Sequence, residues 1–242
     1  PDIGKFFKEV NWCTSQDEVF NKSELIIIAK RPIDQYNLLK SFANFENKKL
    51  ILEKPLTQDP KSSLEILDNL YSKKVPFRIS YTFFYTQWFH KLSNLLAKKN
   101  KSAITIEWNF KANHFEKNID TWKRSKKGGG VIDFYGIHLL AILARKGYKF
   151  SSSSIYRNNS QEEVAWEAQL DSSTLPKIKI KIDTFSNKKN FLIYSEEKNF
   201  LHSDIDPYGE DVKTSQFDRR VITLESLIFD FFENPTVIPP WY

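Results

Sequence analysis

Short apolar runs alternate with amphipathic stretches over the first 80 residues, and this alternation limits the fold more than any other feature of the sequence. Leu25–Ala29 is a continuous apolar run of strand length, which is typical of a parallel strand buried on both faces. Two further strand-like runs follow at Lys49–Leu52 and Phe77–Tyr81. A helical pattern over about 34–44 and another that opens at Asp59-Pro60 separate them. The order strand–helix–strand–helix–strand predicts parallel strands joined by crossover helices, which is half of a doubly wound sheet.

The rest of the chain has a different pattern. Ser102–Lys111 alternates apolar and polar residues, as a strand with one covered face does. Helices are expected from about Val131 to Arg145 and near Val221–Phe232. Between these helices, alternating runs predict a meander of antiparallel strands. The runs are Ser154–Asn158, Val164–Leu170, Lys177–Thr184, Asn190–Ser195 and Asn199–His202.

These patterns predict the fold class α/β plus α+β in two domains. Residues 1–80 are expected to form the C-terminal part of a Rossmann domain, a partial doubly wound parallel sheet. Residues 81–242 are expected to form an α+β domain on a large, mainly antiparallel open sheet.

Composition excludes several functional classes. Cys13 is the single cysteine among 242 residues, which excludes a disulfide framework and a thiolate zinc site, and we expect no metal. No apolar run has the length of a membrane span and no signal peptide is visible, so we expect a cytoplasmic protein with no membrane partner. The formal net charge is +6, but lysines are mixed with acidic residues throughout. This mixing favours a solvated surface over a nucleic-acid patch.

The tripeptide Glu53-Lys54-Pro55 directly follows the second predicted strand. In a doubly wound sheet, ligands bind beyond the carboxyl ends of the strands, so a lysine here is placed to meet a substrate. Pro55 stiffens the turn, and the bond that precedes it is of the type that can be cis. The alternative is a surface lysine in an ordinary turn.

The segment from Gly128 to His138 is the second candidate site. Its three consecutive glycines allow close approach of the backbone to a ligand or strand, and the following helix N-terminus favours an anion. His138 lies on an apolar helix, where a lone histidine is usually a buried core residue. Gly136, two residues earlier, is expected to open space beside the ring. Histidine is also the side chain best suited to exchange a proton near neutral pH.

Together the two segments resemble the Gfo/Idh/MocA family of oxidoreductases. Glu53-Lys54-Pro55 matches the E-K-P motif of that family, and Gly128 to His138 is similar to its G-G-G-x-x-x-D-x-G-x-H motif. Leu25–Ala29 with Pro32 is similar to its strand ending in I-A-T-P, and Trp122-Lys123-Arg124 resembles its W-R segment. The resemblance runs in order over nearly the whole chain.

The resemblance implies an oxidoreductase whose Rossmann domain binds NAD or NADP, and whose second domain covers the substrate and forms a homo-oligomer contact. Family substrates are typically sugars, polyols and nucleotide sugars. The implied catalytic residues are Lys54, which polarises or deprotonates the reacting hydroxyl, His138 as its acid/base partner, and Asp133. The implied cofactor-binding residues are Ala29, Lys30, Arg31, Pro32, Glu53, Lys54 and Pro55. The implied substrate-binding residues are Trp122, Lys123, Arg124, Tyr135 and His138.

The sequence departs from the family at several of these positions. The acidic residue expected four positions before His138 is Phe134, whereas Asp133 lies five before. On a helix, five positions turn a side chain by about 140°, so Asp133 is expected to point away from Lys54 and His138. Tyr135 is a substitute proton donor or a packing aromatic. The Thr-Pro pair of the family is replaced by Lys30-Arg31, which either bind a phosphate or are simply exposed, and its usual histidine by Gln35.

No G-x-G-x-x-G dinucleotide loop occurs in the sequence. In the family this loop belongs to a unit that precedes the strand at Leu25–Ala29, and without that unit the strand has an open edge. We therefore expect the native chain to extend N-terminally by about 50–70 residues. Two functions are compatible with the pattern: an NAD(P)-dependent oxidoreductase, or a non-catalytic or altered-cofactor relative that serves as a sugar-binding or assembly subunit.

Overall fold

The computed structural model describes residues 10–41, 45, 47–97, 102–196, 199–209 and 218–234. Residues 1–9 of the first predicted domain and the Pro-rich end of the chain lie outside this range. The strands and helices that the sequence pattern predicts occur in the described residues in the predicted order.

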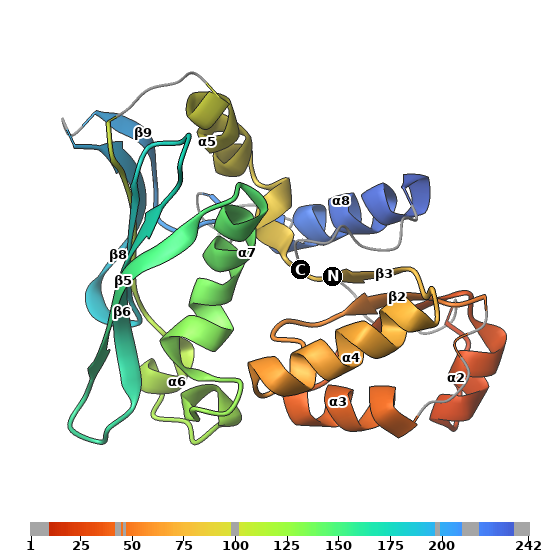
Figure 1. The fold of residues 1–242 in the computed structure, drawn as a ribbon. Helices are drawn as coiled ribbons and strands as arrows, with labels where there is room; N and C mark the ends of the chain where they lie inside the picture. The colour runs from red at the N-terminus through yellow and green to blue at the C-terminus, as the bar shows by residue number, and fades with distance from the viewer. Residues whose placement is uncertain are drawn as a thin grey trace.

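Three short parallel strands form the smaller sheet in the order β1 (Leu25–Ile28), β2 (Lys49–Leu52) and β3 (Phe77–Ile79). The helices that connect them, α3 (Pro32–Ser41) and α4 (Pro60–Ser72), lie on one face of the sheet (Figure 1). Asp59 caps α4 by accepting a hydrogen bond of 2.9 Å from the backbone of Ser62. The short α2 (Gln16–Lys22) precedes β1.

Strand β1 is less buried than its all-apolar sequence predicts. Ile26 and Ile28 face the core, but 49% of Ile27 is exposed. Among the described residues β1 pairs with β2 alone, and the apolar cluster on this face of the sheet reaches Leu25 without including Ile27. The prediction of burial on both faces is therefore wrong at Ile27.

Six strands form the larger sheet in the order β5-β6-β7-β4-β8-β9. Their bounds are β4 Ile104–Lys111, β5 Lys149–Arg157, β6 Glu163–Asp171, β7 Ile178–Asp183, β8 Phe185–Ser195 and β9 Phe200–Asp204. All neighbours are antiparallel except β4 and β7, which are parallel. The predicted meander is therefore wrong at one point, because β4 lies between β7 and β8. The two sheets together confirm the predicted fold class.

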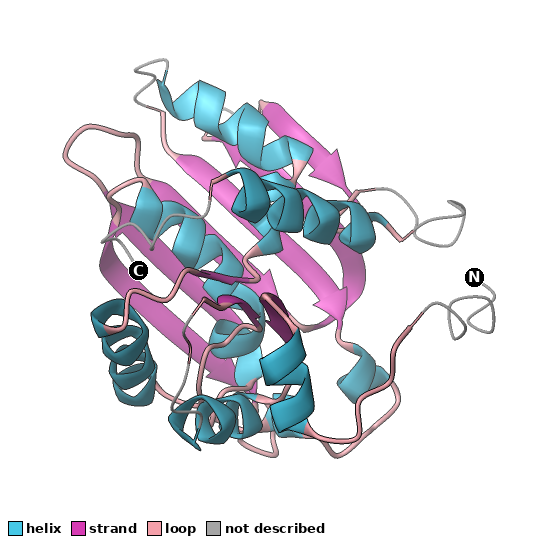
Figure 2. Cartoon of the chain, turned by 90° about the vertical axis from the view of Figure 1, so that its right-hand side faces the viewer, coloured by secondary structure: helices cyan, strands magenta, loops and turns pink. Residues whose placement is uncertain are grey.

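Helices cover one face of the larger sheet. They are α5 (Gln87–Ala97), the short α6 (Asn113–Glu116) and α7 (Ile137–Arg145), which lie to the right of the sheet in Figure 1 and in front of it in Figure 2. The isoleucines of β7 point toward these helices and are buried, as their alternation with lysines predicts. The opposite face carries charged side chains such as Lys181, whose Nζ lies 3.8 Å from Glu167 of β6.

The last helix, α8 (Arg219–Glu233), returns to the smaller sheet. Leu227 and Phe231 pack on Ile51 of β2, which places α8 on the face opposite α3 and α4 (Figure 1). Arg78 of β3 donates a hydrogen bond of 2.8 Å to the backbone of Asn234. This helix therefore packs on the parallel sheet although its residues fall in the range 81–242. Within the described residues, no helix has the length and apolarity needed to cross a membrane.

Candidate active site

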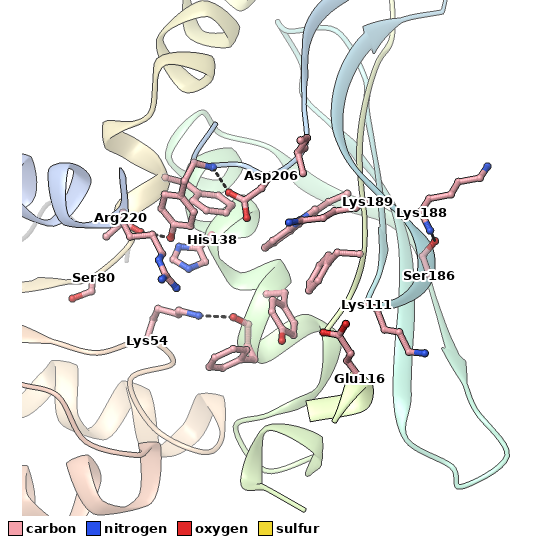
Figure 3. Close-up of a pocket in the computed structure, with 18 of the residues that line it drawn as sticks. Lys54, Ser80, Lys111, Glu116, His138, Ser186, Lys188, Lys189, Asp206 and Arg220 are labelled. Atoms are coloured by element: carbon pink, nitrogen blue, oxygen red, sulfur yellow. Dashed lines mark hydrogen bonds between the residues drawn. The ribbon is translucent and has the colours of Figure 1, made fainter. Parts of the chain in front are cut away.

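The three parallel strands end at one edge of the smaller sheet. Ile28, Leu52 and Ile79 lie side by side in register, so the residues that follow them leave the sheet together. A cavity of about 1010 Å³ opens at this edge. Its walls come from the ends of β2 and β3, from β4 and β8, and from the segment that leads into α7 (Figure 3). This is the position at which open α/β sheets bind ligands.

Lys54 lies two residues beyond the end of β2 and lines the cavity at this edge. Its peptide bond to Pro55 is cis. The ammonium group donates a hydrogen bond of 2.5 Å to the backbone carbonyl of Phe134 and lies 3.9 Å from the centre of its ring. Although part of Lys54 is accessible from the cavity, protein surrounds the side chain, and this burial lowers its pKa to about 7, against the opposing charge of Glu53. An amine with this pKa can take up a proton near neutral pH.

His138 lies in the first turn of α7 and lines the same cavity. Only 4% of it is exposed, its ring stacks on Phe83 with 4.3 Å between centroids, and Nδ1 is buried with no hydrogen-bond partner. Burial, followed by the charge of Lys54, holds its pKa well below the ordinary value, so the ring is neutral. An unpaired buried nitrogen costs about 1–3 kcal/mol, and such groups are expected where a ligand supplies the partner.

The glycines serve close packing. They border a single π-helical turn, Val131–Gly136, that leads into α7. A Cβ on Gly128 would lie 3.1 Å from Pro32 at the start of α3, and one on Gly136 would lie 2.9 Å from the Trp166 ring. The expectation that Gly136 opens space beside His138 is therefore wrong, because the indole of Trp166 fills that space.

Three residues of this turn have different surroundings. Phe134 lies between Lys54 and Lys123, whose Nζ is 4.8 Å from the ring centre. Tyr135 lines the cavity, and burial raises the pKa of its hydroxyl. Asp133 does not line the cavity within the described residues; burial and the nearby charge of Glu163 raise its pKa to about 6. Tyr135 therefore lines the same cavity as Lys54 and His138. Asp133 lies near Glu163 of β6 and outside the described cavity wall, in agreement with its position five residues before His138.

The Trp122-Lys123-Arg124 segment contributes through Phe134 rather than through the cavity wall. Trp122 packs edge-on against Phe134, with 5.5 Å between centroids. Arg124 points elsewhere and forms two hydrogen bonds with Glu162, of 2.5 and 3.0 Å. The described cavity wall includes none of these three residues.

The segment after β1 lies beside Glu53-Lys54-Pro55 at the sheet edge. Ala29 and Lys30 are exposed, and Pro32 is buried against Gly128. Arg31 is exposed and forms an ion pair of 2.6 Å with Asp34. This contact directs the guanidinium toward its own helix, whereas the Lys30 side chain is exposed beside it.

Sequence reasoning missed the far wall of the cavity. Asp206 and Tyr208 follow β9, and Arg220 comes from α8. Figure 3 shows Asp206 and Arg220 at the cavity. The Tyr208 hydroxyl is hydrogen-bonded to Thr82 at 2.8 Å, and Asp206 lies within the electrostatic reach of Lys189 and Arg220. These residues lie more than 100 positions from Lys54 and carry no motif, so only the sheet order places them here.

The described residues fit the nicotinamide end of a dinucleotide. The Lys54 amine and the His138 ring line the cavity at the edge beyond β1 and β2, and the buried Nδ1 of His138 has no hydrogen-bond partner. For the phosphates, the described residues provide no glycine-rich loop after a parallel strand. In the same described part of the chain, no cluster of His, Cys, Asp or Glu could hold a metal ion.

Comparison with known proteins gives a likeness of structure. No family model matches the chain, and no curated protein matches it. The NAD-binding protein of Listeria innocua superposes with a TM-score of 0.63 at 16% identity, covering 82% of this chain and 62% of its own. GenD2 from gentamicin A biosynthesis, solved with NAD, superposes with a TM-score of 0.72 at 11% identity, covering 99% of this chain and 78% of its own. The UDP-N-acetylglucosamine 3-dehydrogenase GnnA of Acidithiobacillus ferrooxidans superposes with a TM-score of 0.66 at 10% identity, covering 97% of this chain and 79% of its own.

These likenesses show a shared fold, and it is the fold that the resemblance to Gfo/Idh/MocA oxidoreductases implies. The chain spans less than two thirds of the length of the Listeria protein. At identities of 10–16% the shared fold says nothing of substrate, because one fold hosts many activities.

Proposed function

We propose that the protein is an NAD(P)-dependent oxidoreductase that acts on a hydroxyl or carbonyl group of a sugar or nucleotide sugar. The observation that carries this proposal is the meeting of Lys54, Tyr135 and His138 on one cavity at the carboxyl edge of the parallel sheet. The NAD complex of GenD2 and the named substrate of GnnA support the cofactor and substrate class. A cytoplasmic location and a homo-oligomer belong to the same proposal.

Each side chain has a distinct part in the proposed reaction. The neutral Lys54 amine accepts the proton of the substrate hydroxyl, and its carbonyl partner on Phe134 orients it. His138 lines the cavity as a neutral ring and serves as the hydrogen-bonding and proton-exchanging partner of Lys54. Tyr135 holds a hydroxyl that burial keeps protonated, so it donates to a substrate oxygen. Ala29–Pro32 and Glu53–Pro55 would hold NAD or NADP, which would supply the hydride acceptor for the substrate carbon.

The test combines cofactor binding with turnover. Calorimetric titration with NAD and NADP establishes whether either cofactor binds. A panel of sugars and nucleotide sugars is then screened for substrates that reduce the cofactor that binds. Lys54→Ala and His138→Ala should each lower turnover by about 10²–10⁴-fold. Lys179→Ala, which removes an exposed lysine of β7, is the matched control and should leave turnover unchanged. Unaltered turnover in Lys54→Ala would remove this residue from the mechanism.

A second function remains in competition. Phe134 occupies the position where the family resemblance implies an acid, and the Arg31 guanidinium is engaged by Asp34. Both favour a relative that binds a sugar without oxidising it. Binding of a sugar or nucleotide sugar in calorimetry, with neither NAD nor NADP binding, would support this second function.

A further inference from the structure

Gln35 is a fully buried polar side chain close to the candidate site. It lies in the first turns of α3, and 0% of it is exposed. Burying an amide costs about 1–3 kcal/mol unless its donors and acceptor find partners. The partners of Gln35 therefore show what the surrounding structure uses it for.

All partners of the Gln35 amide belong to the loop that carries Lys54. Its Nε2 donates hydrogen bonds to the carbonyl of Glu53 at 2.9 Å and to the carbonyl of Leu56 at 2.8 Å. Its Oε1 accepts one of 2.9 Å from the backbone N–H of Glu53. Both amide hydrogens and the acceptor oxygen are thus used, which satisfies the side chain.

These hydrogen bonds hold the chain on both sides of Lys54. Glu53 precedes it and Leu56 follows two residues later, so the backbone of the turn is tied to α3 at each end. The far end of the Lys54 side chain is held separately by the carbonyl of Phe134. Lys54 is therefore held at both ends: Gln35 holds its loop backbone, and the carbonyl of Phe134 holds its ammonium group.

We propose that Gln35 is a positioning residue that holds the loop of Glu53–Leu56 so that the Lys54 amine stays at the cavity edge. It acts through Lys54 and contacts no substrate. Its effect on turnover rests on the proposed function, whereas its effect on Lys54 does not. Gln35 also follows Pro32 by only three residues, so it joins the segment proposed to hold the cofactor and the loop with the proposed base in one rigid unit.

The competing explanation is that Gln35 merely stabilises the packing of α3. Leu39 separates the two explanations because it lies one turn later on the same helix, is 1% exposed and belongs to the apolar core. A Leu39→Ala substitution weakens the packing of α3 and leaves the three hydrogen bonds to the loop in place. It is therefore the matched control for a loss of stability without a loss of positioning.

The experiment measures the titration of Lys54 in the full chain. Lysines are methylated with ¹³C reagent and followed by NMR from pH 5 to 11, and Lys54→Arg assigns the Lys54 signal. The wild type should show a Lys54 pKa near 7. In Gln35→Leu the loop is released and the amine meets water, so its pKa should rise by at least about 1 unit toward the ordinary value near 10.4. Leu39→Ala should melt at a lower temperature with the Lys54 titration unchanged.

Turnover provides the second readout where a substrate has been found. Misplacement of a reacting group by about 1 Å costs on the order of 100-fold, so kcat should fall by about this factor in Gln35→Leu while the dissociation constant of the cofactor changes less. If Gln35→Leu does not fold, Gln35→Asn replaces it. Asn is one methylene shorter and cannot reach all three backbone atoms, so the Lys54 pKa should still rise.

The outcomes separate the two proposals. A folded Gln35 variant whose Lys54 titrates as in the wild type would overturn the positioning role. If the wild-type chain binds neither NAD nor NADP, the proposed function fails, while the Lys54 titration still decides the role of Gln35.

Discussion

The ammonium group of Lys54 lies 3.9 Å from the centre of the Phe134 ring and donates a hydrogen bond to the backbone carbonyl of the same residue. Neither partner carries a formal charge. A cation–π contact and a carbonyl replace only part of the hydration that burial removes, so the pKa of Lys54 falls to about 7. Phe134 thus permits a neutral lysine at the position where an acid would favour its charged form.

Oxidation of the substrate should therefore depend on pH through Lys54. Turnover should rise as pH increases through about 7, because only the neutral amine accepts a proton. The charged and titratable groups near the amine are Glu53, which favours its charged form, and Lys123 and His138. Phe134→Asp places an opposite charge beside it and should raise the midpoint by about 1–3 units. The measurement is a pH profile of kcat.

Phe134→Leu is the control for that experiment, since it removes the ring and adds no charge. Its midpoint should move much less than that of Phe134→Asp. Equal midpoints in the wild type and Phe134→Asp would show that Lys54 does not set the profile.

Replacing Lys54 by methionine should stabilise the protein in a pH-dependent way. The pKa of the folded state, about 7, lies below the ordinary value, so the unfolded chain binds more protons between pH 7 and about 10.4 and stability rises across this window. Below pH 7 both states are charged and the folded state bears the full burial cost. Lys54→Met should therefore add roughly 1–3 kcal/mol at pH 6, and the gain should shrink toward pH 10.

Urea unfolding at pH 6 and pH 10 measures this difference. Lys179→Met, at an exposed position of β7, is the control and should change stability little at either pH. A gain that is equal at both pH values would mean that Lys54 is not buried as a charged group.

Local sequence pattern predicted the near half of the site. Lys54 comes just after a strand, and His138 lies at the start of a helix, that apolar periodicity predicts. Both residues line the cavity. The alternation of Ile178, Ile180 and Ile182 likewise predicted the covered face of β7. These features depend on residues a few positions apart, which is the range over which periodicity is informative.

The remainder depends on contacts that are distant in sequence. The parallel pairing of β4 with β7 is not encoded in either strand alone, because both carry the same alternation. Arg220 reaches the cavity only because α8 returns to the parallel sheet. Gln35 has no signature as a buried clamp, since its partners are backbone atoms of another segment.

Gly136 should not tolerate a side chain. A Cβ there would lie 2.9 Å from Cζ3 and 3.1 Å from Cε3 of Trp166, whose ring is fully buried on β6 and cannot withdraw freely. Gly136→Ala should therefore lower the free energy of unfolding by about 1–3 kcal/mol through overpacking. Urea denaturation measures the loss. Trp166→Leu in the same chain removes the clashing ring, and the alanine should then cost less than in the wild-type background; an equal cost in both backgrounds would contradict the packing explanation.

Asp133→Asn should raise stability and leave turnover unchanged. Burial and Glu163 raise the Asp133 pKa to about 6. Between pH 4 and 6 the folded state therefore binds the Asp133 proton more tightly than the unfolded chain does. The stability that the protonated form contributes is lost as pH rises through this window. The neutral amide should therefore add on the order of 1–2 kcal/mol at pH 8 and little near pH 4. Asp68→Asn, at an exposed position of α4, is the control for denaturation at both pH values. Turnover should stay within about 2-fold because Asp133 does not line the described cavity, whereas a loss of about 10²-fold would place it in the catalytic group that the family resemblance implies.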